Sequence, residues 1–403
     1  MILSPTVLKI FRLNLTLVHV LGCTSFSIKT DKNLGPKIIP CDKQTSTKQW
    51  IKLALSIILV FTLFLQVLQA KGKEEDFQIL ESTLYASSLF AFAITNAAYL
   101  SMNKFVSEFL NCLIQFEKRE PDMMTGSTKD KWIVNYGQFN GLIAAPIFGL
   151  PYAIQRWLSP CNSATFAWYI LEECLTQPIG IKLEPNSIIL LSITSVFSMW
   201  LIFYLIGAFA FYCAGVFYVT SYCIVNYLIN FRIVLENCEV NRIEKVLKKY
   251  RQLQIFERHL NSIHQNVIIT VMLNPLILGV IISAYSLINL GSQLSIPHLI
   301  LFSSILIINI TAIVLLCGTL GLVHTESTIT LAYLDKTLIT RLESEIGRSA
   351  VFGKFNLKFI KRFVASLYVL KVRIGNANFV EKTTPMVVLE FCVEQIVNLL
   401  LMN

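Results

Sequence analysis

The sequence predicts an all-α polytopic membrane protein with seven transmembrane helices, a cytosolic N-terminus, an extracellular C-terminus and a helical cytosolic anchor region. Three observations lead to this fold class. Of the 403 residues, 54% are hydrophobic and only 15% are charged, whereas about a quarter of a soluble chain is charged. Uncharged apolar runs of about 20 residues, long enough to cross a bilayer, recur along the chain. The basic residues gather in the loops between these runs, where orientation signals belong.

The elements follow from these runs in chain order. Residues 1–50 are expected to be cytosolic and to hold an amphipathic helix on the membrane surface, because Lys9 and Arg12 interrupt the apolar run of a signal peptide. Apolar residues recur at three- and four-residue spacing in 324–378, which predicts cytosolic anchor helices. The transmembrane helices are expected at about 51–70, 82–103, 132–155, 187–231, 266–288, 297–323 and 379–403.

The fourth of these segments is unusually long. As a single helix, 187–231 would extend about 68 Å, roughly twice the hydrocarbon thickness of a bilayer. It is either two spans with a hidden hairpin or one helix whose inner half leaves the bilayer and packs on the anchor region. With one helix, 29 of the 34 basic residues fall on the cytosolic side, and a hairpin would move sixteen of them outside. The positive-inside rule therefore favours one long helix.

Several classes of function are excluded by what the chain lacks. It has no Gly-x-Gly-Asp motif, no zinc-binding His spacing and no nucleophile elbow, so we do not expect an enzyme. Its ten cysteines show neither metal spacing nor a disulfide framework, and we expect no metal or cofactor. The net charge of +9 resides in orienting loops, so it does not indicate nucleic acid. The predicted orientation places Cys161 and Cys174 in one extracellular loop, where a disulfide between them is permitted.

The last helix carries a polar stripe. An ionised carboxylate at bilayer depth costs about 2.5–3.5 kcal/mol on insertion scales, so its two glutamates must face protein or water. In one interpretation they are a buried acid pair bonded to groups such as Asn309 and Thr311. In the other they line an aqueous path and, repeated around a symmetric oligomer, form acidic rings that favour cations. The stripe, at helical spacings of three and four, is Thr383, Val387, Glu390, Glu394, Asn398 and Leu401, with Gln395 beside it.

Aromatic and polar residues in the outer halves of the helices are candidates for a small-molecule site. Such pockets are mostly apolar and aromatic, with a few polar groups that fix the ligand. Each candidate also fits ordinary helix packing. The candidates are Tyr85, Phe90, Phe148, Tyr152, Phe197, Trp200, Tyr285 and Ser286.

Two stretches of sequence carry a family resemblance. LVHVLGCTSFS (17–27) is similar to a Leu-Gly-x-x-x-Phe entry, and GNANFVEKTTPMVVLEFCVEQIVNLLLM (375–402) has the layout of a closing Thr-Tyr, five apolar residues and Gln-Phe. Glu394 and Gln395 stand at the Thr-Tyr positions, and Leu401 and Met402 at the Gln-Phe positions, so none of the four is identical. Together with the long fourth segment and the minimal tail, these features resemble the arthropod gustatory and odorant receptor superfamily, as a divergent gustatory-receptor-like member.

The resemblance implies a chemosensory receptor in the plasma membrane. Such a receptor is a ligand-gated, nonselective cation channel of four subunits, either identical or related, opened by a small-molecule tastant or odorant. The seventh helix lines the pore, the cytosolic base forms most of the subunit contact, and membrane lipids surround the spans. The resemblance places Asn398 and Leu401 at the pore constriction, on the stripe that periodicity had already identified.

Two other classes stay open. A secondary transporter would use Glu390 and Glu394 as ion or proton sites near the midplane, although no inverted repeat is visible. A G-protein-coupled receptor also has seven spans, but it requires the opposite orientation, and no Asp-Arg-Tyr follows the third span. Channel currents far exceed transporter turnover, so electrophysiology separates a channel from a transporter.

Overall fold

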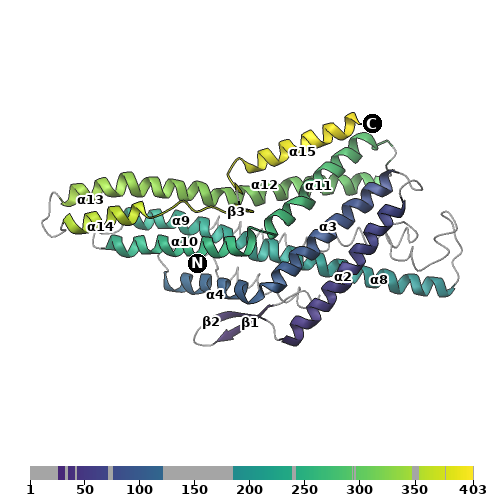
Figure 1. Ribbon diagram of the computed structural model, residues 1–403, viewed down its shortest axis with the longest axis horizontal. Coiled ribbons are helices and arrows are strands. Elements are labelled where there is room, and N and C mark those ends of the chain that lie inside the picture. The colour runs from purple at the N-terminus through teal and green to yellow at the C-terminus, as the bar shows by residue number, and fades with distance from the viewer. Residues whose placement is uncertain are drawn as a thin grey trace.

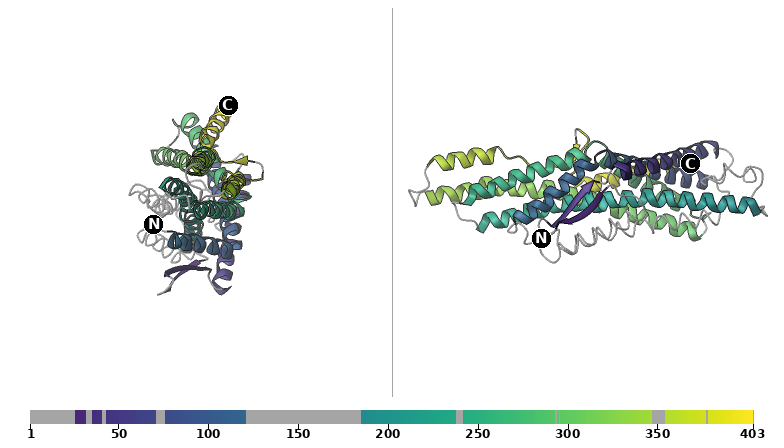
Figure 2. Two further views of the ribbon diagram at one scale, coloured as in Figure 1. Left: turned by 90° about the vertical axis from the view of Figure 1, so that its left-hand side faces the viewer. Right: turned by 90° about the horizontal axis from the view of Figure 1, so that it is seen from below.

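A computed structural model of the chain is shown in Figure 1 and describes residues 26–31, 35–40, 43–70, 76–120, 185–237, 242–292, 294, 296–346, 354–376 and 378–402. These residues form an elongated bundle of helices with two small β-hairpins (Figures 1 and 2). In chain order the elements are β1 (Phe26–Asp31), β2 (Gly35–Pro40), α2 (Lys43–Ala70), α3 (Asp76–Ser101), α4 (Asn103–Arg119), α8 (Pro185–Ala210), η2 (Phe211–Tyr218), α9 (Val219–Asn237), α10 (Ile243–His264), α11 (Ile268–Asn289), α12 (Ile296–Tyr333), η4 (Leu334–Leu338), α13 (Ile339–Ile346), α14 (Lys354–Ala365), β3 (Arg373–Ile374), β4 (Asn378–Phe379) and α15 (Thr384–Leu401).

The molecule has two ends of different character. The span end holds α2, α3, α8, α11, α15 and the first part of α12, whereas the base end holds α4, α9, α10, α13 and α14 (Figure 1). The part of the chain that the structure describes has five helices long and apolar enough to cross a membrane: Gln44–Leu65, Met199–Asn237, Ile268–Asn289, His298–Lys336 and Thr384–Leu401. The protein is a multi-pass membrane protein.

Two of the seven predicted spans are not among these five. The predicted span 82–103 lies on α3, which is helical, and the predicted span 132–155 lies outside the described residues. After α3 the chain bends at Met102 and continues as the amphipathic helix α4, where the sequence analysis expected a loop. The hydrophobic face of α4 packs inward through Val106, Phe109 and Leu113, so tertiary packing stabilises this helix.

Two long rods connect the span end to the base end. The first runs without a break from Pro185 to Asn237 through the π-helical segment η2, which at 1.5 Å per residue is about 80 Å. No hairpin interrupts it, in agreement with a single fourth segment. The second rod runs from Ile296 through η4 to Ile346, so the expected border between span six and the anchor region at residue 323 falls inside one continuous helix.

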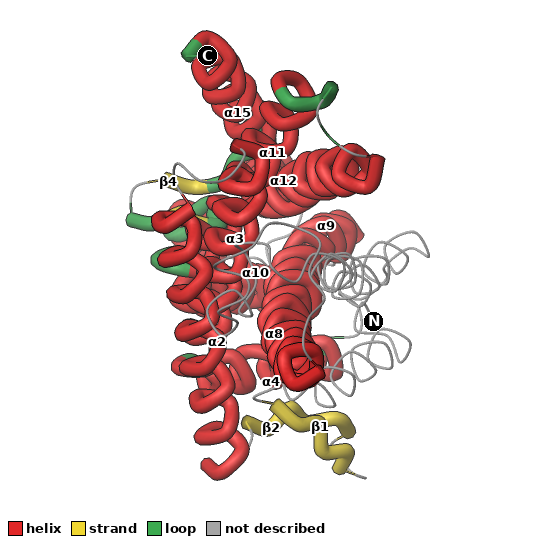
Figure 3. Tube along the Cα trace, turned by 90° about the vertical axis from the view of Figure 1, so that its right-hand side faces the viewer, coloured by secondary structure: helices red, strands yellow, loops and turns green. Residues whose placement is uncertain are grey.

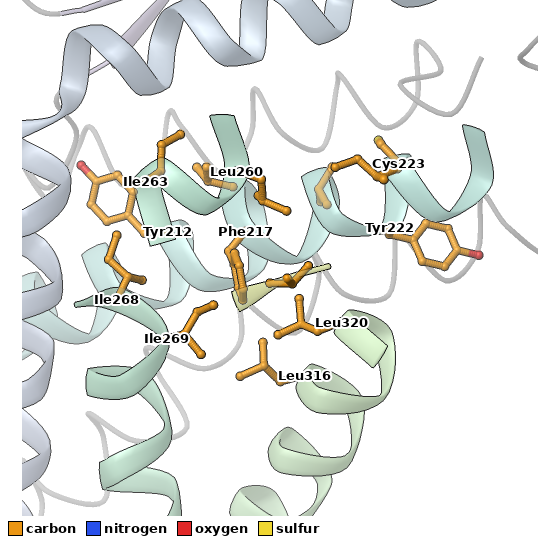
Figure 4. Close-up of a cluster of buried hydrophobic side chains, with 14 of the residues drawn as sticks. Tyr212, Phe217, Tyr222, Cys223, Leu260, Ile263, Ile268, Ile269, Leu316 and Leu320 are labelled. Carbon is orange, nitrogen blue, oxygen red and sulfur yellow. The ribbon is translucent and has the colours of Figure 1, made fainter. Parts of the chain in front are cut away.

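A cluster of buried side chains lies where the two ends meet (Figure 4). Side chains of η2, α9, α10, α11 and α12 interlock there, among them Phe217, Leu260, Ile269 and Leu320 (Figure 4). Burying each of these side chains contributes about 1.5–3 kcal/mol. The fully buried His264 ring lies in the same layer, and burial lowers the pKa of His264 to about 3, so this histidine is neutral.

His264 makes two hydrogen bonds that fix its tautomer. Its Nδ1 is 2.8 Å from the carbonyl oxygen of Leu260, which can only accept, so Nδ1 carries the proton. Its Nε2 therefore accepts from the hydroxyl of Tyr99, 2.8 Å away. The Tyr99 ring stacks on that of Tyr212 at 4.0 Å between centroids. This cluster joins α3, η2 and α10 close to the point where each of them bends or changes its winding.

The all-α prediction missed two antiparallel hairpins. In the predicted N-terminal segment, residues 1–25 lie outside the described residues, and β1 pairs with β2 from Phe26↔Pro40 to Asp31↔Gly35. The second hairpin, β3–β4, lies directly before α15 and pairs Arg373 with Phe379. Within the predicted anchor region 324–378, α14 ends at Ala365, and 367–372 continues without helical structure.

Candidate ion path and ligand site

Helix α15 lies along the outside of the bundle, at the edge of the end view opposite the β1–β2 hairpin (Figure 3). It contacts α11 and α12. Its packed face carries the buried Pro385 and Cys392 and the half-buried Val388, Leu389 and Ile396, which recur at three- and four-residue spacing. Apolar packing therefore fixes which side of α15 turns toward the rest of the chain.

The acid-bearing stripe occupies the opposite side of α15. Glu390 and Glu394 each stand two residues from the buried Cys392, which on an α-helix places them about 160° away from it. All six stripe residues are exposed in the single chain, and Leu401 is 79% exposed. Gln395 is half-buried and lies between the two faces, so it is the pore-lining candidate least aligned with the stripe.

The partners suggested for a buried acid pair lie elsewhere on α12. Asn309, proposed as a partner, is on α12 with its amide occupying the space that a Cβ at Gly279 would need. The Thr311 hydroxyl donates to the carbonyl of Ile307 in its own helix. Neither residue bonds the glutamates, which are exposed and therefore do not form a buried acid pair within the chain.

An exposed acidic face on a membrane helix needs water or another polypeptide beside it. Lipid cannot cover two carboxylates at bilayer depth without the cost of about 2.5–3.5 kcal/mol each that insertion scales assign to aspartate. Beside the stripe, Val393 is exposed and apolar, with 58% of its surface accessible. A helix with a polar stripe next to an apolar side is suited to line an aqueous path in an assembly of several copies.

The start of α15 is held close to α12. A Cβ at Gly321 would lie 2.5 Å from the Glu381 carbonyl carbon and 2.6 Å from the Lys382 nitrogen, so only glycine permits this approach. The Glu381 N–H donates to the Thr384 hydroxyl at 2.8 Å, and Pro385 occupies the first turn, where its missing N–H costs nothing. These features fix where the helix begins and the direction in which it leaves α12.

The described ligand candidates on α3 and α8 are only partly buried. On α3, Tyr85 is half-buried, whereas Phe90 is 48% exposed and meets Phe64 of α2 edge to face at 6.0 Å. On α8, Phe197 is 43% exposed and lies 6.1 Å from the half-buried Trp200. Exposed aromatic side chains at the span end are suited to contact lipid as well as ligand.

The candidates on α11 are better buried. Tyr285 is 8% exposed, and its hydroxyl accepts from the Asn289 amide at 2.9 Å. Ser286 is fully buried, and its hydroxyl, like that of the neighbouring Ser283, has no hydrogen-bond partner among the residues that the structure describes. The remaining candidates, Phe148 and Tyr152, and the two loop cysteines Cys161 and Cys174 lie outside the described residues.

A buried polar group that the sequence analysis missed joins α2, α3 and α8. Asn96 donates to the Tyr204 hydroxyl at 2.9 Å, and that hydroxyl lies 3.4 Å from the Gln49 carbonyl oxygen. The Lys52 ammonium lies 5.3 Å from the centre of the Trp200 ring, within cation–π range. Polar residues inside a span are costly, so Asn96 within an apolar run was the signal that could have identified this site.

The fold matches two solved structures of the insect olfactory receptor OR5 from Machilis hrabei. The structure of that receptor has a TM-score of 0.63 and 13% sequence identity, and the match covers 100% of this chain and 99% of that one. The structure of its complex with eugenol also has a TM-score of 0.63, with 11% identity and 99% coverage of both chains. No protein-family model and no curated protein matches the chain. The chain has the fold of an insect olfactory receptor over its whole length, which confirms the resemblance predicted from its sequence at the level of the fold.

Proposed function

We propose that this chain is a subunit of a chemosensory receptor that acts as a ligand-gated, nonselective cation channel of the gustatory and odorant receptor superfamily. One observation carries the proposal: the acid-bearing stripe of α15 faces away from the chain's own bundle, on a fold shared with an insect olfactory receptor. Four subunits around an axis would turn these stripes toward a common centre. Glu390 and Glu394 would then form two acidic rings that attract cations.

The constriction of the proposed pore lies near the end of α15. Asn398 and Leu401 occupy the constriction positions that the resemblance implies, and both side chains are exposed on the stripe. Asn398 is polar, so closure of the pore by dewetting depends mainly on the Leu401 side chains, one from each subunit, that would surround it. Gln395 contributes to the pore only if the helix turns about its axis in the assembly, because its side chain is half-buried here.

The proposed ligand is a small-molecule tastant or odorant. The related receptor structure with eugenol supports a small-molecule ligand for this fold. Tyr285 and Ser286 on α11 are the strongest of the described candidates, because they are buried and offer hydroxyl groups inside an apolar bundle. The gustatory type, with the plasma membrane as its location, rests on the sequence resemblance.

The orientation of the proposed channel follows from its charges. The 29 basic residues assigned to one side come from the N-terminal segment and from the stretches after the second, fourth and sixth predicted spans. The described helices of those stretches, α4, α10, α13 and α14, lie at the base end (Figure 1), which predicts that the base end is cytosolic. The two long helical rods reach from the span end into this base. The tetrameric base would form most of the contact between subunits, either four copies of this chain or this chain with related subunits.

The position of the glutamates disfavours a secondary transporter. Transporters place their ion sites between their own helices near the midplane, commonly at broken helices. Here α15 is an unbroken helix from Thr384 to Leu401, and both glutamates point away from the bundle of the same chain. An opening between several chains suits them better than a site within one chain.

Whole-cell recording tests the channel proposal. Cells expressing the wild-type chain are compared with cells expressing Glu390→Gln/Glu394→Gln at equal surface density, for basal current and for current evoked by a panel of small volatile and tastant compounds. External sodium is exchanged for a large organic cation. We expect a cation current whose reversal potential shifts toward that of chloride in the double variant. Currents with the same cation selectivity in both would refute the acidic rings.

A further inference from the structure

The segment 366–375 runs from the end of α14 through strand β3 and is called the strap here. It has little regular structure, yet Leu370 and Val372 within it are fully buried. Buried backbone groups must find hydrogen-bond partners, and in the strap neighbouring helices supply them through their side chains. The strap lies in the middle of the molecule, beside the start of α15 (Figure 1).

Asn261 of α10 replaces a missing neighbouring strand. Its Nδ2 donates to the Lys371 carbonyl oxygen at 2.7 Å, and its Oδ1 accepts from the Arg373 N–H at 2.9 Å. A C=O and the N–H two residues later are the pair that an adjacent strand would engage. Glu257 accepts from the same Nδ2 at 2.6 Å, which orients the amide. The Asn261 side chain is 6% exposed, so these bonds are made away from water.

Further bonds fix the strap on both sides of Asn261. The Gln254 amide donates to the Tyr368 carbonyl at 3.1 Å, and the Leu370 N–H donates to the hydroxyl of Ser327 on α12 at 2.8 Å. At the far end the Gly375 N–H donates to the Gln265 carbonyl at 2.7 Å. Gln265 stands in the turn between α10 and α11, so the strap is tied to the corner from which α11 begins.

Through these bonds the strap, which continues by way of the β3–β4 hairpin into α15, is attached to the same corner of α10 from which α11 begins. From this arrangement we propose that Asn261 is a positioning residue, which holds the strap on α10 and thereby sets the position of the pore helix relative to the base and the fraction of time the channel is open. The inference rests on the proposed channel function. Loss of the Asn261 amide removes the two bonds that hold the strap between Lys371 and Arg373, where the hairpin that leads into α15 begins. The bonds to Gln254, Ser327 and Gln265 remain.

The chain contains a matched control in Asn111 of α4. Its Nδ2 donates to the Ile38 carbonyl at 2.7 Å, and its Oδ1 accepts from the Ile38 N–H at 2.9 Å. The chemistry is the same as at Asn261, but the extended segment is β2, far from α15 in the chain and at the opposite edge of the bundle (Figure 3). Asn111→Leu and Asn261→Leu therefore both remove a two-bond amide clip, and only the second should reach the pore helix.

Hydrogen–deuterium exchange on the purified full-length chain tests the strap without requiring current. In Asn261→Leu we expect the amides of 371–375 and of the first turn of α15 to exchange about tenfold faster than in wild type. In Asn111→Leu faster exchange should be confined to the β1–β2 hairpin. Unchanged exchange in α15 for Asn261→Leu, or equal acceleration there in Asn111→Leu, overturns the inference.

A second pair of variants covers the case in which Asn261→Leu fails to fold. Gln254→Leu removes one bond to the strap, whereas Gln252→Leu makes the same change at an exposed position two residues away on α10. We expect Gln254→Leu alone to loosen the strap and to change basal current by severalfold at equal surface density. Equal currents in the two variants overturn the inference. An absence of current in wild type with the expected exchange pattern would instead count against the channel and leave the strap in place.

Discussion

The approach of α15 to α12 predicts different outcomes for two glycines one turn apart. At Gly321, a Cβ would lie 2.5–2.6 Å from backbone atoms of Glu381 and Lys382, against 3.4 Å for the closest ordinary contact. The backbone would have to retreat by about 1 Å, and it cannot rotate aside as a long side chain can. At Gly318, the same Cβ meets nothing within 4 Å. Gly321→Ala is therefore expected to destabilise the folded chain relative to Gly318→Ala.

The magnitude follows from two opposing terms. Alanine is favoured over glycine inside a helix by about 0.8–1.0 kcal/mol, and both variants gain this. Overpacking a tight contact costs about 1–3 kcal/mol, and only Gly321→Ala incurs it. The difference in free energy of unfolding between the two variants is thus about 1–3 kcal/mol, with the helix preference cancelled. Gly318→Ala should equal or exceed wild type in stability.

Heating the detergent-solubilised full-length chain and measuring the folded fraction by size-exclusion chromatography gives the thermal midpoint of each variant. The expected order is Gly318→Ala at or above wild type, with Gly321→Ala below both. Gly321→Ala as stable as Gly318→Ala would refute the close approach and, with it, the position assigned to the start of α15.

Three further predictions concern His264, Glu257 and Gly375. His264 stays neutral in the fold down to about pH 3, whereas in the unfolded chain it titrates near 6.5. The free energy of unfolding therefore falls as the pH drops below 6.5, by about 2 kcal/mol at pH 5. His264→Gln should remove this dependence in thermal midpoints measured from pH 7.5 to 5. Burial raises the pKa of Glu257 in the fold, so stability is lost as the pH rises from the ordinary range of a carboxyl group through that raised pKa. Glu257→Gln, which keeps the oxygen that accepts from Asn261, should raise the midpoint at pH 7.5 more than at pH 5, and the reverse would contradict the burial argument. Gly375 has a left-handed φ of 59°, and Gly375→Ala should cost about 1–2 kcal/mol of unfolding free energy, whereas no loss would mean the turn is not held.

The polar stripe of α15 could be predicted from sequence, but its direction could not. Spacings of three and four residues place Glu390, Glu394 and Asn398 on one face of any helix. The same pattern is compatible with a buried acid pair and with an aqueous path. Only the packing of Cys392 and Ile396 on the bundle shows that the stripe turns away from its own chain.

The anchor region was predicted only in part, for a physical reason. Helix α14 stops at Ala365, because the backbone that follows forms hydrogen bonds with side chains of α10 and α12 and not with the preceding helical turn. Such tertiary bonds leave no periodic signal. Helix α4 did leave one, since Val106, Phe109 and Leu113 recur at three- and four-residue spacing in a stretch that was assigned to a loop.

The β1–β2 hairpin illustrates the same limit at the other end of the chain. Asn111 holds β2 on α4, because its amide bonds both polar backbone groups of Ile38 across 73 residues of sequence. The long rods were more accessible to prediction. The uncharged run 187–231, together with the charge balance of the loops, indicated one helix, and the structure is helical from Pro185 to Asn237.

We expect the acidic stripe of α15 to face water and the side that carries Val393 not to, and chemical accessibility tests this difference. Cysteine replaces Glu394 or Asn398 on the stripe, or Val393 on the flank, one at a time, with the buried Cys392 left in place. Intact cells are treated with a positively charged, membrane-impermeant methanethiosulfonate, and modification is scored by blocked maleimide labelling, which requires no ligand. We predict fast modification at the two stripe positions and little at Val393. Modification at Val393 with protection of the stripe would show instead that α15 presents another face to water.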